Sequence, residues 1–163
     1  MHSVGEKVMY GGAGLMEIVD VREESFGDIP RKYYVLRDLR SSSDSQTFVP
    51  VDNDKLTSAM HPLLTKEVAS DLISRAAAIP LLECSSDNRI RAEKFKSIIE
   101  SGDREALISL IKTVNEINRM RHGEGKKSSL ADESALKKAE KLIYAEFSEV
   151  LGLSEAEIAE IIG

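Results

Sequence analysis

The sequence predicts an α+β protein in which a small antiparallel sheet precedes an all-α helical domain. Between Arg31 and Val51, aromatic and β-branched runs flank a polar Ser/Asp loop, which is typical of a β-hairpin. Beyond Thr65 the apolar residues recur with a helical period and are separated by capping residues. Because strands come first and helices follow, two separate domains are expected.

Short strands and tight turns fill the N-terminal part of the chain. The strand-like runs cover residues 7–10, 15–21, 32–36 and 46–51. The connections are a glycine turn at 11–14, a turn with Gly27, Asp28 and Pro30, and the Ser/Asp loop at 41–45. This pattern is typical of a small Tudor/SH3-like barrel, which we assign to residues 1–56.

Capping residues divide the remainder into helices. The expected helices start after Thr65, after the loop at 84–88, at Asp103, after Ser128-Ser129 and at Ser154. Gly102 is a plausible C-terminal stop between the second and third of them. We therefore assign residues 57–163 to an all-α helical domain.

Charge is distributed unevenly along an acidic chain. The 163 residues carry a formal net charge of −6, which gives no global reason to expect nucleic-acid binding. Residues 86–127, however, hold ten Lys/Arg against seven Asp/Glu, whereas residues 128–163 hold three against eight. The basic segment is the part of the chain best suited to a polyanion.

The sequence favours a cytoplasmic protein without cofactors. Its single cysteine, Cys84, excludes an internal disulfide and fits a reducing compartment. No signal-like or membrane-spanning apolar run is present, so a membrane partner is not expected. We expect a monomer.

No residue pattern indicates an enzyme. The glycine turn at 11–14 and the segment 123–128 lack the spacing and the flanking elements of phosphate-binding loops. The histidines are isolated from one another, so no metal site is indicated. Cys84 follows an apolar run and is best interpreted as a small hydrophobic residue.

Basic residues gather at one predicted helix start and one predicted helix end. Segment 88–96 begins the first of these helices, and Arg119 and Arg121 lie near the end of the next. Short loops between antiparallel helices would bring the two clusters together. A helix start with Asn and Arg suits a phosphate, although a solvated charged surface is the simpler interpretation.

Taken in order, several short motifs resemble the CarD/CdnL family of bacterial transcription regulators. Residues 4–10, followed by the glycine turn and 14–18, are similar to the opening of that family. The runs 33–36 and 48–51 are similar to its next strands. Ser101-Gly102-Asp103 and residues 139–143 with Glu146 resemble its helical half. The resemblance spans nearly the whole chain.

The resemblance implies a Tudor-like domain that binds the β subunit of bacterial RNA polymerase and a helical domain that contacts promoter DNA. Such proteins alter the stability of the open complex and have no enzymatic activity. The implied polymerase-binding residues are Arg22, Tyr33, Phe48, Val49 and Pro50. The implied DNA-contacting residues are Asn88, Arg89, Arg91, Lys94, Lys96, Arg119 and Arg121.

The chain departs from the family at the expected DNA contact. The family tryptophan would fall at or near Asn88, but the chain has no tryptophan. An apolar wedge between bases is therefore missing there. Glu93 stands where the family often has lysine. Promoter contacts are thus expected to be weak and mostly to phosphates.

Three alternatives stay open. The first is a polymerase-binding adaptor that has lost DNA binding. The second is a small enzyme that uses Cys84 or a pair of carboxylates. The third is a Tudor-type reader of a methylated ligand, with a cage built from Tyr10, Tyr33, Tyr34 and Phe48.

Overall fold

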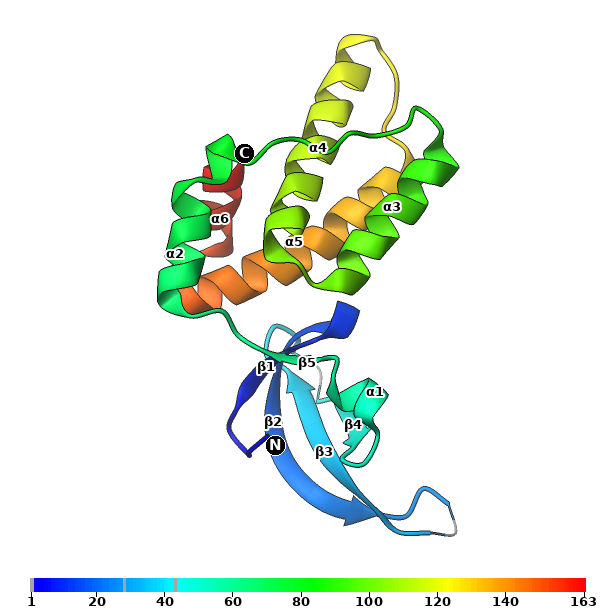
Figure 1. Ribbon diagram of the computed structural model, residues 1–163, viewed down its shortest axis with the longest axis vertical. Helices are drawn as coiled ribbons and strands as arrows, with labels where there is room; N and C mark the ends of the chain where they lie inside the picture. Colours follow the sequence, from blue (N-terminus) through cyan, green and yellow to red (C-terminus); the bar gives the residue numbers. More distant parts are fainter. Residues whose placement is uncertain (1, 28, 43) are drawn as a thin grey trace. The chain divides into compact units, whose positions relative to one another are not determined.

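A sheet and a group of helices form two separate units in the computed structural model, which describes residues 2–27, 29–42 and 44–163 (Figure 1). The first unit ends at Leu63 and the second covers Leu64–Gly163. The mixed α+β class, with strands first, is therefore confirmed. Asp28 and Ser43, which the sequence places in turns, lie outside the described residues.

The β unit is a five-stranded antiparallel sheet in the order β4-β3-β2-β1-β5. Its strands are β1 (Lys7–Tyr10), β2 (Gly14–Glu24), β3 (Arg31–Asp38), β4 (Gln46–Pro50) and β5 (Met60–Pro62). A short 3₁₀ turn, η1 (Gly11–Ala13), joins β1 to β2. Gly14 has a φ of +101°, which an L side chain rarely adopts, so glycine is required at this corner.

Both faces of the sheet carry buried residues, since Leu15 and Val35 are buried as well as the positions that alternate with them. The buried residues of one face form a cluster, because alternate residues point to the same face of a strand. This cluster consists of Val8, Met16, Ile18, Tyr34, Leu36, Val49 and Met60. Between Ile18 and Asp20 the pairing of β2 with β3 shifts register. Such an irregularity bends a strand and re-aims the side chains beyond it.

A fifth strand lies beyond the predicted end of the sheet. Asn53 caps the short helix α1 (Asp54–Thr57), its side chain accepting a hydrogen bond from the Leu56 amide at 3.1 Å. β5 then pairs antiparallel with β1. The expected boundary at residue 56 therefore falls inside the β unit, ahead of β5.

The helical unit contains the helices that the capping pattern predicts. They are α2 (Lys66–Ser74), α3 (Asn88–Ser101), α4 (Arg104–Gly123), α5 (Leu130–Leu151) and α6 (Glu155–Ile162), with a 3₁₀ turn η2 (Ala76–Ala78). Their N-caps are Thr65, Asp87, Asp103, Ser129 and Ser154, each with its side chain bonded to a backbone amide of the first turn. Gly102 ends α3 in the left-handed conformation.

The long helix α5 packs against the other helices of its unit (Figure 1). Phe95 of α3, Ile111 of α4, Phe147 of α5 and Ile158 of α6 are fully buried. Burying large apolar side chains of this kind is the main favourable contribution to folding. None of the described helices has the length and apolar character needed to cross a lipid bilayer.

Candidate functional site

Three aromatic rings gather on the β unit. Phe26, Tyr33 and Phe48 meet edge to face, with ring centroids 5.2 Å (Phe26–Tyr33), 5.1 Å (Phe26–Phe48) and 6.1 Å (Tyr33–Phe48) apart. The sheet register explains the gathering, because Tyr33 lies opposite both Arg22 of β2 and Pro50 of β4. We call Arg22, Phe26, Tyr33 and Phe48 the aromatic patch.

A cation–π contact and two ion pairs hold Arg22 beside the three rings of this patch. Its guanidinium carbon lies 5.3 Å from the centre of the Phe48 ring, a cation–π distance. It forms ion pairs with Asp20 at 3.5 Å and with Glu24 at 3.0 Å. The pair with Glu24 lacks hydrogen-bond alignment, and the buried Nε atom has no acceptor among the described residues. Arg22 therefore keeps unused hydrogen-bonding capacity.

The aromatic patch contains three of the five residues that the resemblance implies for polymerase binding. Arg22, Tyr33 and Phe48 lie together, and Pro50 is half-buried opposite Tyr33. Tyr33 is buried, at 8% exposure, and contributes little surface, while Val49 is fully buried in the core cluster, so the Val49 side chain is not available to a partner. This corrects the expectation for Val49, which follows from strand alternation between Phe48 and Pro50.

Phe26 belongs to the patch although the sequence placed it in an undistinguished turn. Its side chain is 65% exposed, which is unusual for phenylalanine in contact with two other rings. A large aromatic residue just beyond a predicted strand is the signal that points to it. An exposed aromatic ring next to an arginine is typical of protein-binding surfaces.

The four aromatic residues of the proposed methyl-ligand cage do not converge. Tyr34 belongs to the core cluster, and Tyr10 packs against that cluster. Tyr33 and Phe48 are on the patch instead, and there the rings touch one another directly. Rings in mutual contact leave no space for an ammonium group between them.

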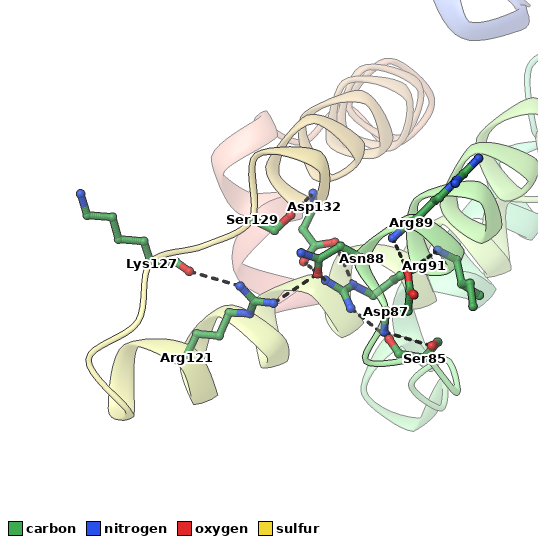
Figure 2. Close-up of polar contacts among 10 residues, drawn as sticks. Ser85, Asp87, Asn88, Arg89, Arg91, Arg121, Lys127, Ser129 and Asp132 are labelled. Carbon is green, nitrogen blue, oxygen red and sulfur yellow. Dashed lines mark hydrogen bonds and ion pairs between the residues drawn. The ribbon is translucent and has the colours of Figure 1, made fainter.

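Basic residues from two helices meet at one end of the helical unit. Figure 2 shows Arg121 near the end of α4 reaching Asn88 at the start of α3, with 3.5 Å from Arg121 Nη2 to Asn88 Oδ1. Arg121 Nη1 also donates to the Lys127 carbonyl at 3.3 Å. The antiparallel arrangement thus brings the two predicted clusters together. We call this end, with its residues Asn88, Arg89, Arg121 and Lys127, the basic end.

Arg91 is a structural residue rather than a phosphate contact. Its side chain is 3% exposed and donates to both oxygens of the fully buried Asp132, Nε at 2.9 Å and Nη2 at 2.8 Å (Figure 2). It also donates to the Ser85 carbonyl and to Asn88 Oδ1. The hydrogen bond to Asp132 raises the pKa of Arg91 above its ordinary value. The expectation that Arg91 faces DNA is therefore corrected.

The remaining predicted DNA contacts differ in whether their charged groups already have a partner. Arg119 is exposed but pairs with Glu116, Nε to Oε2 at 3.0 Å. Lys94 is exposed and donates to the Glu83 carbonyl. Arg89 and Lys96 are exposed on α3 and form no ion pair within residues 2–27, 29–42 and 44–163. These two are the best placed to meet an anion.

A second buried ion pair joins α4 to α5. Arg104 donates from Nε to Glu146 Oε1 at 2.8 Å and from Nη2 to Oε2 at 2.9 Å. The Glu146 side chain is 1% exposed. Neither Arg104 nor Asp132 was among the residues predicted from the sequence. The sequence signal for the two buried carboxylates is their spacing. Asp132 and Glu146 fall on the same helical stripe as the buried Ala139.

Cys84 is a half-buried free cysteine. Burial raises the pKa of its thiol, and the positive charges of Lys94 and Arg91 oppose that shift only partly. A high pKa lowers the fraction of thiolate, which is the reactive form. The described part of the chain holds no group of three or more His, Cys, Asp or Glu side chains arranged for a metal ion.

No protein-family model matches the sequence, and no curated protein matches it.

Proposed function

We propose that the chain is a CarD-like transcription regulator whose β unit, a Tudor-like module, docks on the β subunit of bacterial RNA polymerase. The observation that carries the proposal is the aromatic patch on the β unit. Phe26 offers exposed apolar area there, and Arg22 offers an incompletely satisfied guanidinium. Aromatic residues and arginine are the side chains most often found at the energetic centre of a protein interface.

The edge of the sheet supports the same mode of docking. β4 carries Phe48 and pairs on one side with β3, so it forms an edge of the described sheet. A strand from a partner can add to such an edge through main-chain hydrogen bonds, while side-chain pockets set the specificity. The proposed docking surface therefore consists of the β4 edge together with the aromatic patch.

The helical unit would contact promoter DNA from its basic end and the adjoining surface of α3. Among the predicted DNA contacts, Arg89 and Lys96 are exposed and form no ion pair within the described residues, and Lys94, Arg119 and Arg121 can supplement them. Contacts of this kind meet phosphates rather than bases. The proposal has the protein act on open complexes in the bacterial cytoplasm, with no catalytic step of its own.

A binding measurement with the isolated polymerase β lobe tests the docking half. Phe26→Ala removes an exposed ring, so the fold should survive while the affinity falls by about tenfold, the effect of losing a hot-spot side chain. Arg22→Ala should act in the same direction. Val4→Ala is the matched control, because Val4 is another exposed apolar residue of the same unit, at 59%. Full affinity in both patch variants would refute the docking surface.

The adaptor without DNA binding is the second candidate, and a specific observation favours it. The Arg91 guanidinium is paired with the buried Asp132 carboxylate. The Asn88 side-chain oxygen accepts hydrogen bonds from Arg91 and Arg121. Part of the predicted phosphate-binding surface therefore has a structural role. The tryptophan wedge is also missing.

A salt titration separates the two candidates. If the helical unit contacts DNA, the binding constant of a polymerase–promoter complex for the protein should fall with added salt, and Arg89→Ala combined with Lys96→Ala should reduce the slope by about two phosphate contacts. An unchanged slope, with an unchanged promoter footprint, would leave the adaptor as the function. Lys55→Ala, which removes one positive charge from the β unit, is the control for a nonspecific effect of charge.

A further inference from the structure

Only three residues connect the last strand of the β unit to the first helix of the helical unit. β5 ends at Pro62 and α2 begins at Lys66. Of the residues between them, Thr65 already belongs to the helix as its N-cap, because its side chain accepts a hydrogen bond from the Val68 amide at 3.2 Å. The conformation of Leu63 and Leu64 therefore determines how the two units are tethered.

Leu64 is held by the buried ion pair between α4 and α5. Its amide donates to Glu146 Oε2 at 3.0 Å, the same oxygen that accepts from Arg104 Nη2 at 2.9 Å. The Glu146 carboxylate thus receives three donors, two from Arg104 and one from the backbone of the connecting segment.

This hydrogen bond is harder to break than an ordinary loop contact. The carboxylate is 1% exposed, so water cannot readily replace a donor that leaves. A buried charge that loses a hydrogen bond incurs a desolvation penalty larger than that of a neutral group. Charge-assisted bonds are also stronger than neutral ones. The Leu64 amide is therefore held as firmly as a helical amide.

On the N-terminal side of Leu63, the chain is fixed by the pairing of β5 with β1. Pro62 and His61 lie opposite Val8 and Met9 of β1, and the Gly11 amide donates to the Ala59 carbonyl at 2.9 Å. The sheet pairing thus extends to the last residue of β5. Among the three connecting residues, Leu63 forms no hydrogen bond to the part of the chain that the structure describes.

We infer that Glu146, supported by Arg104, anchors the connecting segment and reduces the flexible tether between the two units to Leu63. Glu146 is a positioning residue, because it limits the part of the connecting segment that can move. The inference does not depend on the proposed function.

Backbone relaxation and amide hydrogen exchange in the full-length wild-type protein test the anchor directly. The Leu64 amide lies outside any helix or strand, yet it should exchange as slowly as amides in the first turn of a stable helix. Its order parameter should match that of α2, at about 0.85, whereas Leu63 should be lower. An order parameter below about 0.6 at Leu64 would overturn the inference.

Glu146→Gln tests the cause of the protection. The amide group of glutamine is a weaker acceptor than a carboxylate, and its NH₂ group opposes the Arg104 donors, so exchange at Leu64 should accelerate by about tenfold or more while α4 stays protected. Glu160→Gln, an exposed change of the same charge on α6, should leave Leu64 unaffected. Unchanged Leu64 exchange in folded Glu146→Gln would contradict the anchor. If that variant does not fold, the wild-type order parameters decide.

Discussion

The Arg91–Asp132 pair shows how one buried charge fixes neighbouring helices. Arg91 of α3 reaches the first turn of α5 through Asp132 and the loop before α3 through the Ser85 carbonyl. The carboxylate is fully buried and the guanidinium nearly so. Each charge therefore depends on the other for its solvation. The pair holds the start of α3 in the position from which Arg89 points outward (Figure 2).

Removing the carboxylate should destabilise the helical unit severely. Asp132→Asn leaves the Arg91 charge buried and unpaired, which costs about 3–5 kcal/mol in comparable cases. Urea denaturation followed by the helical circular dichroism signal measures this loss. Glu93→Gln, an exposed change of the same charge on α3, should stay within about 0.5 kcal/mol of the wild type. A loss under about 1 kcal/mol in Asp132→Asn would show that Arg91 finds other partners.

The Cys84 thiol should react slowly at neutral pH. Because burial raises its pKa, the thiolate forms at a higher pH than in a free cysteine. The rate of alkylation by iodoacetamide should therefore be lower than that of the denatured protein at pH 7 and should reach half its maximum at a pH above the midpoint of the denatured protein. A midpoint below that value would indicate an activated thiol and would revive the enzyme alternative.

The basic side chains could be recognised from the sequence, but their partners could not. Asp132 lies 41 residues from Arg91 along the chain, and Glu146 lies 42 residues from Arg104. No local pattern joins positions so far apart. Only the placement of carboxylates on an apolar helical stripe hints that they are buried. Exposed Arg89 and buried Arg91 are therefore equivalent in the sequence and differ in the folded protein.

At the scale of elements, local sequence signals were sufficient to predict where most helices begin. Thr65, Asp103 and Ser154 were predicted as helix starts, and each side chain caps its helix. These predictions are confirmed because capping depends on residues within one turn. β5 was missed for the opposite reason. Its three residues contain a proline and a histidine, and only pairing with β1 makes them a strand.

A pair of glycine substitutions tests the predicted stop between α3 and α4. Gly102 has a φ of +70°, so Gly102→Ala should destabilise the helical unit by about 1 kcal/mol even though open space surrounds the new methyl group. Gly123, in the last turn of α4, has equally open surroundings and an ordinary helical conformation. Gly123→Ala should therefore be neutral or stabilising. Thermal unfolding of both variants provides the comparison, and equal effects would argue against strain at Gly102.

At the scale of the whole molecule, the division into a sheet and a helical unit could be predicted because the hydrophobic period changes once along the chain. The aromatic patch could be predicted only in part. Arg22, Tyr33 and Phe48 came from a resemblance, whereas Phe26 joins them through tertiary contacts that no strand pattern contains. A short tether would then make the two proposed binding surfaces act together.

Lengthening the tether should weaken that cooperation. Inserting Gly-Ser-Gly-Ser between Pro62 and Leu63 leaves both anchors in place but lowers the effective concentration of one unit for the other's binding partner. Affinity for the isolated polymerase β lobe should not change, whereas occupancy of a polymerase–promoter complex should require about tenfold more protein. Equal behaviour of the insertion variant in both assays would show that the units do not bind jointly.

The pairing of β1 with β5 also has a consequence for the order of folding. β1 is the first strand in the sequence, and its neighbour β5 is the last, so β5 is synthesised after every other strand of the sheet. Contacts between distant parts of a chain form slowly because the intervening loop must close first. A nascent or truncated chain that stops at residue 56 would thus expose the edge of β1 and lack Met60 in its core. On refolding from denaturant, the sheet should become protected later than the helices.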